Sequence, residues 1–456
     1  MIPSFYKTEL YGVEFPGFPS NAGASSLALQ FQLEQSQWFD SAKIINHQFD
    51  QIRLLVNYAY RTVPFYKKLF DEHNFLPESL QNPEDITNIP LLKRTELQEN
   101  PEQIISQEIP REHGHVFDVS TSGSTGRPVD VKRTVLMNQV WDGLILREHN
   151  WYQRDVTQEY ATIKYAKKGE WEPPFGLIRQ GWGSATQLIF DNGLSSYLNS
   201  SAPIDVQLDW LKHRNPAYLF IYPTNLFELA KRAIDRNIKI DNLKHIRTNG
   251  ESLPDGLRDV CKRAFDVELY DIYGTLEVGF IAFQCPEQGH YHVQSENVYV
   301  EILDENDKPC KPGGIGRVVI TSLHNFATPL IRYDIGDYAS FGDPCECGRG
   351  LPVISKIYGR TRNVLTLPNG DKYWPTFGYR EYSKIADIKQ FQIIQKTLTK
   401  LHVRLVCEQM TSDQEDSLRE VIRDAMRYDF EIDITYHDNL ERGPSDKFEE
   451  FKSELL

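Results

Sequence analysis

Small hydroxyl-bearing residues and glycines interrupt a strand-like stretch between Val116 and Val131. A tight turn of this composition presents many backbone N–H and hydroxyl donors, which is how proteins cradle a polyphosphate. A flexible linker has a similar composition, and no lysine follows the second glycine as a Walker A loop requires. The alternating strand before the turn and the β-branched residues after it favour the phosphate loop. Its residues are Ser120, Thr121, Ser122, Gly123, Ser124, Thr125 and Gly126.

Three charged residues farther along the chain could act on a bound phosphate ester. Glu277 lies in DIYGTLEVG (271–279), Asp337 ends PLIRYDIGD (329–337), and Lys447 lies in ERGPSDKF (441–448). Each has an ordinary alternative, since Glu277 could be a helix-start acid, Asp337 a turn residue and Lys447 a solvent-facing lysine. Only their order after a phosphate loop favours the functional interpretation.

Cysteine and histidine residues form two clusters that could hold a metal. Cys345 and Cys347 lie in DPCECGRG, and Cys285 precedes His290 and His292 in QCPEQGHYHVQ. Four such sulfur and nitrogen donors suit a structural zinc ion, although the spacing is not that of a standard finger. Buried free thiols are the alternative. We interpret the other cysteines as ordinary packed or surface residues: Cys261, Cys310 and Cys407.

Composition limits the function classes. The 456 residues, 40% hydrophobic, suffice for a large core and more than one domain. No run of 18 apolar residues and no apolar leader occurs, so we expect neither a membrane span nor a secretory signal. Six cysteines in a chain of this length indicate a reducing compartment, which predicts a cytoplasmic protein. The net charge of −14 argues against a nucleic-acid partner but permits a small anionic ligand.

The elements that must position these residues follow from periodicity. Helical spacing predicts a helix that includes Ile52, Leu55, Tyr58 and Ala59 and breaks at Pro64. Short apolar runs alternate with helical stretches, as in the strand 218–223 and the helix 224–235, which predicts α/β layers. From about residue 291 strands dominate, with NVYVEIL and GRVVITSL flanking a Pro-Gly-Gly turn at 312–314.

The last hundred residues predict a separate small α+β unit. QFQIIQ and KLHVRLVCE form a hairpin, a helix begins at Ser412, and the strand EIDITYH follows. A capping box of Ser412 with Glu415 opens the helix. Its buried stripe comprises Leu418, Val421, Ile422, Ala425 and Met426. We expect an α/β fold with a large N-terminal ATP- and acid-binding domain, residues 1–360, and a small mobile C-terminal α+β lid, residues 361–456.

These motifs, in this order, resemble the adenylate-forming superfamily, the acyl-CoA synthetases and their relatives. STSGSTGRP is similar to the family's phosphate loop, and Val129 stands where many members carry lysine, as in the phenylacetate–CoA ligase-like branch. LLVNYAYRTVPFYKKLFDEHNF and IPLLKRTEL (89–97) also resemble that branch. TNGESLP (248–254), DIYGTLEVG, PLIRYDIGD, GRTRN (359–363) and ERGPSDKF complete the set over nearly the whole chain.

The resemblance implies a role for each matched position. Tyr273 would lie against the adenine, Glu277 would ligate Mg²⁺, Asp337 would bind the ribose hydroxyls, Arg360 would lie near the ribose, and Lys447 would be the catalytic lysine. The implied nucleotide-binding residues, besides the loop 120–126, are Asn249, Gly250, Glu251, Asp271, Tyr273, Gly274, Thr275, Asp337 and Arg360. Some relatives carry a similar Cys/His zinc set, and that pattern favours Cys285, His292, Cys345 and Cys347 over a set with His290.

Several positions depart from the family pattern. Thr275 lies one place early for a hydroxyl next to Glu277, and Arg362-Asn363 replaces a frequent Asp-Asp pair at the hinge. LTLPNGDKYWPTFG (365–378) stands where CoA ligases of the branch have a glycine-containing loop, and Asp446 replaces the glycine before Lys447. Adenylation is therefore better supported than transfer to CoA.

We therefore expect an ATP- and Mg²⁺-dependent enzyme that converts a small carboxylic acid to an acyl-adenylate with release of pyrophosphate. CoA is the leading acceptor, which would make the protein an acid–thiol ligase. The abundance of aromatic residues and YPTN (222–225) favour an aromatic acid. The alternatives are transfer of the acyl or AMP group to a carrier-protein thiol, an amine or a hydroxyl, or a nucleotide-binding module without catalysis. We expect a monomer or homodimer without nucleic-acid or membrane partners.

Overall fold

The computed structural model describes residues 6–120, 128–360, 363–375, 379–382, 384–443 and 448–455. The α-helices are α1 Asn21–Ser36, α2 Ser41–Thr62, α3 Pro64–Glu72, α4 Arg94–Glu99, α5 Val135–Trp151, α6 Ser184–Gln187, α7 Ile204–Arg214, α8 Pro223–Asp235, α9 Leu257–Phe265, α10 Tyr379–Tyr382 and α11 Ser412–Met426. Short 3₁₀ helices are η1 Pro77–Ser79, η2 Pro83–Asn88 and η3 Arg111–His113.

The strands lie mostly in the middle and at the end of the chain. They are β1 Leu92–Lys93, β2 Val116–Ser120, β3 Asp130–Thr134, β4 Tyr160–Lys164, β5 Leu177–Gln180, β6 Leu194–Asn199, β7 Tyr218–Ile221, β8 His245–Asn249, β9 Glu268–Thr275, β10 Gly279–Gln284, β11 Tyr291–Val293, β12 Val298–Leu303, β13 Ile315–Ser322, β14 Tyr333–Phe341, β15 Val353–Arg360, β16 Leu365–Thr366, β17 Lys372–Tyr373, β18 Gln390–Thr397, β19 Lys400–Val406, β20 Glu431–Tyr436 and β21 Phe451–Ser453.

The chain forms two compact units that interleave in sequence. Unit 1 comprises Met1–Tyr160, Ile178–Ser196 and Tyr270–Ile357, and unit 2 comprises Ala161–Leu177, Tyr197–Leu269 and Tyr358–Leu456. The segment 358–456 begins close to the expected boundary at 360 but is grouped with residues of unit 2. The division into a large domain and a mobile lid stays a prediction.

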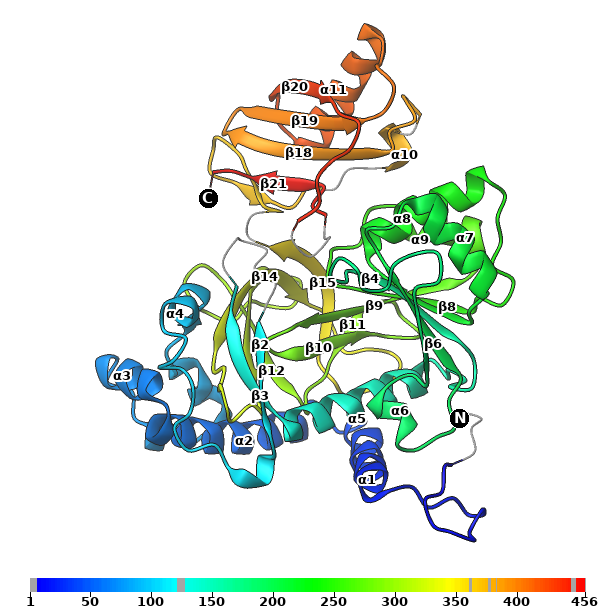
Figure 1. Ribbon diagram of the computed structural model, residues 1–456. Coiled ribbons are helices and arrows are strands. Elements are labelled where there is room, and N and C mark those ends of the chain that lie inside the picture. The colour runs from blue at the N-terminus through cyan, green and yellow to red at the C-terminus, as the bar shows by residue number, and fades with distance from the viewer. Residues whose placement is uncertain are drawn as a thin grey trace. The chain divides into compact units, whose positions relative to one another are not determined.

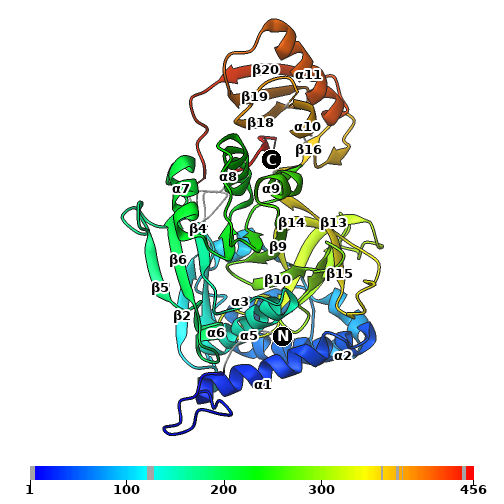
Figure 2. The ribbon, with the colours of Figure 1, turned by 90° about the vertical axis from the view of Figure 1, so that its right-hand side faces the viewer.

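Unit 1 is built on a largely antiparallel sheet. Its strands follow the order β12-β13-β14-β15-β11-β10-β9, and β1 joins β14 in parallel. Figures 1 and 2 show the long helices α2 and α5 along one side of these strands. The predicted helix is confirmed, because Ile52, Leu55 and Ala59 are buried in α2, which ends at Thr62 before Pro64 opens α3. β12 and β13 pair as expected.

Unit 2 holds two separate cores. Around β7 and β8, which pair in parallel, the apolar faces of α7, α8 and α9 pack together. The strand and helix predicted at 218–235 are confirmed as β7 and α8. The second core belongs to the sheet β20-β19-β18-β21, on which α11 packs through Leu418, Ile422 and Met426 (Figure 2).

The start of α11 corrects one prediction. The helix begins at Ser412 as expected, but its N-cap is Thr411, whose side chain accepts the backbone N–H of Gln414. Thr411 has the extended backbone that a cap needs, whereas Ser412 is already helical. Glu415 instead accepts from Tyr436 and pairs with Arg419. Val421 and Ala425 are only partly buried.

The helices were compared with the length and apolar character that a membrane span requires, for the residues that the structure describes. Among those residues, every helix is either too short or too polar to cross a bilayer.

Candidate active site

The residues that the sequence nominates are distributed over both units. Thr121, Ser122, Gly123, Ser124, Thr125, Gly126 and the catalytic candidate Lys447 lie outside the described residues. Ser120 ends β2, where it pairs with Asp130 of β3 in an antiparallel ribbon. The strands predicted on either side of the phosphate loop are therefore confirmed. Val129, at the position where many relatives carry lysine, is fully buried.

Tyr273 and Asp337 come together in unit 1 although 64 residues separate them. The Tyr273 hydroxyl donates to Asp337 Oδ2 over 2.9 Å, and both residues are buried. The aromatic residue from one motif thus orients the carboxylate of another. In the same unit, Tyr291 donates to Asp271 Oδ2 over 2.9 Å. A nucleotide-binding role for both carboxylates stays a prediction.

Gly274 is required by the close approach of β9 and β10. A Cβ at this position would lie 2.5 Å from the carbonyl oxygen of Gly279, which is shorter than any normal contact. Thr275 ends β9, and its hydroxyl accepts the backbone N–H of Val278 over 3.2 Å. This hydrogen bond shapes the turn that carries Glu277. The Thr275 hydroxyl, which stands one place early in the motif, thus makes a hydrogen bond within its own turn.

Glu277 lies in the turn between β9 and β10 and is 3% exposed. Its Oε1 accepts from Arg94 Nη1 over 3.1 Å and lies 3.4 Å from the Tyr333 hydroxyl. The alternative of a solvated helix-start acid is therefore wrong. Sequence reasoning did not assign roles to Arg94 or Tyr333, although both lie in segments quoted for the family resemblance.

In unit 2, the segment predicted to line the adenine follows β8. Asn249 Oδ1 accepts from Lys164 Nζ over 2.7 Å, and the lysine lies over the rings of Phe220 and Tyr222. Gly250 has φ of +86°, a conformation that favours glycine. The sequence contained no signal for Lys164, because its partner lies 85 residues away.

Glu251 binds two separate segments of unit 2. Its Oε2 accepts from the backbone N–H and the hydroxyl of Thr224 over 3.0 and 2.8 Å, and its Oε1 accepts from the backbone N–H of Phe448 over 2.9 Å. Arg442 adds bonds to Thr224 and to Glu228 at 3.1 and 3.0 Å. The motif of the expected catalytic lysine is thereby tied to the start of α8.

Arg360 has a local contact, from its backbone N–H to Asn363 Oδ1 over 3.1 Å.

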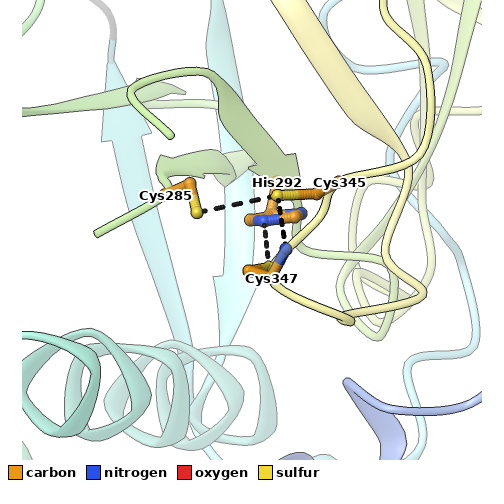
Figure 3. A group of neighbouring side chains, drawn as sticks. All are labelled: Cys285, His292, Cys345 and Cys347. Atoms are coloured by element: carbon orange, nitrogen blue, oxygen red, sulfur yellow. Dashed lines mark hydrogen bonds between the residues drawn. The ribbon is translucent and has the colours of Figure 1, made fainter. Parts of the chain in front are cut away.

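The four expected zinc ligands converge in unit 1 (Figure 3). Cys285 follows β10, His292 lies in β11, and Cys345 and Cys347 lie between β14 and β15. Because β11 pairs with both β10 and β15, the sheet register brings these segments together. Their ligand atoms all lie within 4.8 Å of one another, and His290 does not belong to this group.

The distances in this cluster suit a tetrahedral zinc site. Cys285 Sγ lies 3.9 Å from Cys345 Sγ, and Cys347 Sγ lies 3.4 Å from His292 Nε2. Zinc–ligand bonds of about 2.3 Å to sulfur and 2.0 Å to nitrogen require edges of about 3.8 and 3.6 Å. His292 Nδ1 lies 3.4 Å from the carbonyl oxygen of Leu351, a backbone partner of the kind that orients metal-bound histidines.

Burial sets the protonation of three of these four side chains. It lowers the pKa of His292 to about 4, so the imidazole is neutral and its nitrogen can bind a cation. Burial also raises the pKa of Cys285, and that of Cys345 to about 12. Without a cation these two thiols stay protonated at neutral pH.

The fold is that of the adenylate-forming acyl-CoA ligases. The chain superposes on 2-hydroxyisobutyryl-CoA ligase in the postadenylation state, in complex with 2-HIB-AMP, with a TM-score of 0.71 and 18% identity, covering 91% of each chain. This likeness establishes the α/β architecture that the sequence predicted.

Sequence relatives give the closer relationship. The chain is 25% identical to phenylacetate-coenzyme A ligase of Thermus thermophilus over 339 residues, 72% of this chain and 73% of that protein. It is 23% identical to Protein CapK of Staphylococcus aureus, over 72% of this chain and 69% of that one. Residues 379–454 match the CapK C-terminal domain family. These relatives confirm the resemblance to the phenylacetate–CoA ligase-like branch.

Proposed function

We propose that the protein activates a small carboxylic acid, with an aromatic acid as the first candidate, and transfers the acyl group to CoA. A carboxylate oxygen attacks the α-phosphorus of ATP, the bond to the β-phosphate bridging oxygen breaks, and pyrophosphate leaves. The CoA thiolate then attacks the acyl carbon and AMP leaves. The likeness to phenylacetate–CoA ligases supports this reaction class.

One observation carries the proposal. Tyr273 and Asp337, which come from two separate motifs, share a buried hydrogen bond of 2.9 Å, and Glu277 is buried in the turn after the same strand β9. In the proposed reaction Asp337 accepts hydrogen bonds from the ribose, and Tyr273 holds that carboxylate in place. A fixed ribose positions the α-phosphate for in-line attack.

Charge must be neutralised because two anions meet in the first step. Mg²⁺ bound at Glu277 would supply Lewis-acid stabilisation of the phosphate oxygens. Glu277 fits this role, since among the described contacts only its Oε1 is occupied and Oε2 remains for a cation. Lys447 would place a cation near the carboxylate and the α-phosphate, and the backbone donors of the loop 120–126 would bind the β- and γ-phosphates. ATP and CoA are cytoplasmic metabolites, so we place the reaction in the cytoplasm.

ATP–pyrophosphate exchange tests the first step. We expect isotope exchange with at least one member of a panel of aryl, arylacetic and aliphatic acids, followed by an acyl-CoA product when CoA is added. Failure of every acid to support exchange would contradict the proposal. AMP release that does not depend on CoA would indicate another acceptor.

Two observations favour an acceptor other than CoA. Residues 379–454 match the CapK C-terminal domain family, a family that is not named for CoA ligases. The segment 365–378 also lacks the loop expected of CoA ligases, with Trp374 and Pro375 in its place. A carrier-protein thiol, an amine or a hydroxyl is therefore the second candidate, and product analysis with and without CoA separates the two.

We further propose a structural zinc ion at Cys285, His292, Cys345 and Cys347. The proposal rests on the convergence and spacing of the four ligand atoms. Four protein ligands would leave no open position, so the ion would stabilise the fold and take no part in acyl transfer.

A further inference from the structure

The carboxylate of Glu277 is held on one side only. Both hydrogen bonds that the described residues make to it fall on Oε1, from Arg94 Nη1 at 3.1 Å and from the Tyr333 hydroxyl at 3.4 Å. Arg94 Nη1 also donates to the Tyr333 hydroxyl oxygen over 3.1 Å, which closes a triangle. Within the described part of the chain, Oε2 accepts no hydrogen bond. Two neighbours thus fix the orientation of the carboxylate and leave one oxygen for a ligand.

Strand pairing explains how residues so distant in sequence meet. β1 pairs in parallel with the start of β14, with Leu92 opposite Tyr333 and Lys93 opposite Asp334. Arg94 follows directly as the first residue of α4, so the pairing places it beside Tyr333. Glu96 fixes the start of α4, because its carboxylate accepts the backbone N–H of Lys93, the residue before Arg94, over 2.7 Å. The guanidinium therefore comes from an ordered helix start.

Burial strengthens the electrostatic interactions among these three side chains. The side chain of Glu277 is 4% exposed, that of Arg94 is 16% exposed, and Tyr333 is fully buried. A carboxylate buried in this way needs its partners, because an unpaired buried charge is strongly unfavourable. The same contact could act on a metal in two opposite ways. The positive charge of Arg94 opposes a second cation, whereas fixed orientation of the carboxylate favours it.

We propose that Arg94 and Tyr333 are positioning residues for Mg²⁺ and that orientation outweighs repulsion. Two features carry the choice: the neutral Tyr333 shares the same oxygen, and Oε2 stays available. Hydrogen-bonded partners of ligating carboxylates commonly contribute about 10- to 100-fold to metal affinity. The inference rests on the proposed function of Glu277 as the Mg²⁺ ligand.

Direct metal binding tests the proposal. Mn²⁺ replaces Mg²⁺ as a probe, and free Mn²⁺ is measured by electron paramagnetic resonance with α,β-methylene-ATP, which adenylation cannot cleave. We expect Arg94→Gln to weaken Mn²⁺ binding by about 10- to 100-fold and Tyr333→Phe to weaken it several-fold. The Mg²⁺ concentration for half-maximal pyrophosphate exchange should rise in parallel. Arg317→Gln is the matched control, because Arg317 makes a similarly part-buried pair with Asp334, next to Tyr333, and should leave metal binding unchanged.

The outcomes are distinct. Tighter Mn²⁺ binding by Arg94→Gln would mean that the arginine competes with the metal, and unchanged binding would mean that the contact is only structural; either result overturns the proposal. Tyr333→Phe keeps the ring, so it remains informative if Arg94→Gln fails to fold. A wild-type protein that binds Mn²⁺ with the nucleotide but supports no exchange with any acid would contradict the proposed function and leave this inference standing.

Discussion

At the scale of single residues, Tyr273 is expected to have two roles, one for its ring and one for its hydroxyl group. Its ring is the expected platform for adenine, while its hydroxyl binds Asp337 over 2.9 Å. A hydrogen bond to a charged group contributes about 1.5–3 kcal/mol when both partners are buried. In the proposed site the tyrosine would affect ATP binding through the carboxylate as well as through the ring.

Tyr273→Phe separates these contributions, since it keeps the ring and removes the hydroxyl. We expect the KM for ATP to rise roughly 10-fold, corresponding to about 1.4 kcal/mol, with a smaller change in kcat. Steady-state pyrophosphate exchange measures both constants. Tyr60→Phe is the control, because Tyr60 donates to Asp71 over 2.8 Å at an exposed place in the same unit and should not alter KM. An unchanged KM in Tyr273→Phe would show that the hydroxyl does not position Asp337 for nucleotide binding.

Individual residues were predictable only where a motif marks them. Glu277, Asp337 and Asn249 lie within short ordered motifs, and the structure shows each with a buried or part-buried partner. Those partners left no local signal. Arg94 lies 183 residues from Glu277, and its contact depends on the pairing of β1 with β14. Sequence patterns within a window cannot report such a contact.

At the scale of elements, local periodicity predicted correctly the helices and strands that bury one face of their side chains. β18 and β19 pair as the alternating pattern predicted, and α11 buries Leu418, Ile422 and Met426. The capping residue was misplaced by one position, because Thr411 and Ser412 can both cap and Gln414 and Glu415 can both complete a box. Backbone conformation distinguishes these registers, and the residue types do not.

The proposed zinc ion would connect the β10–β11 region to the loop between β14 and β15. We expect one zinc per chain by mass spectrometry of the purified protein. Cys347→Ser should lose the metal and lower the Tm, because a cluster of neutral thiols and imidazole replaces four metal–ligand bonds. Cys310→Ser is the control, since Cys310 is a free cysteine of the same unit outside the cluster. A metal-free wild type with the same Tm before and after chelation would favour buried free thiols.

The segment that leads into β21 carries a pH-sensitive carboxyl group. Partial burial, with repulsion from Glu251, Asp255 and Glu228, raises the pKa of Glu450 from 4.5 to about 7. The folded state then holds the proton more tightly than the unfolded state between these values. The free energy of unfolding therefore falls as the pH rises from about 4.5 to 7, and the loss is complete above pH 7.

Glu450→Gln removes the titrating group and should flatten this dependence. We expect the variant to have a higher Tm than the wild type at pH 8.5 and nearly the same Tm at pH 4, below both pKa values, as measured by scanning calorimetry. Glu441→Gln, an exposed position in the same segment, should follow the wild type at both pH values. A difference of equal size at both pH values would show that Glu450 does not titrate in this range.

At the scale of the whole molecule, the two units combine distant segments. Unit 2 joins 161–177 and 197–269 to 358–456, so no single cut in the chain separates the units. The sequence predicted a boundary near 360 because the hinge motif GRTRN lies there and the pattern of a separate α+β unit follows it. Grouping by contacts depends on bonds such as those of Arg442 to Thr224 and Glu228, which span more than 200 residues.

The two proposed chemical steps, adenylation and thioester formation, can be tested separately. Lys447 is expected to act on the carboxylate and the α-phosphate, and its motif is flanked by Arg442 and Phe448, which bind Glu228 and Glu251. If the lysine serves only adenylation, thioester formation from a supplied acyl-adenylate does not require it. Pyrophosphate departs only in the first step, so a cation that stabilises its departure has no such role in the second step.

We expect Lys447→Ala to lower ATP–pyrophosphate exchange by roughly 10²- to 10³-fold, the usual cost of removing one transition-state donor. The same variant, supplied with the chemically synthesised acyl-adenylate and CoA, should form acyl-CoA at nearly the wild-type rate. Lys452→Ala, five residues farther along in β21, is the matched control and should retain both activities. Equal exchange by Lys447→Ala and the wild type would favour a nucleotide-binding module without catalysis. Equal loss of both steps would contradict the expectation that the lysine serves adenylation alone.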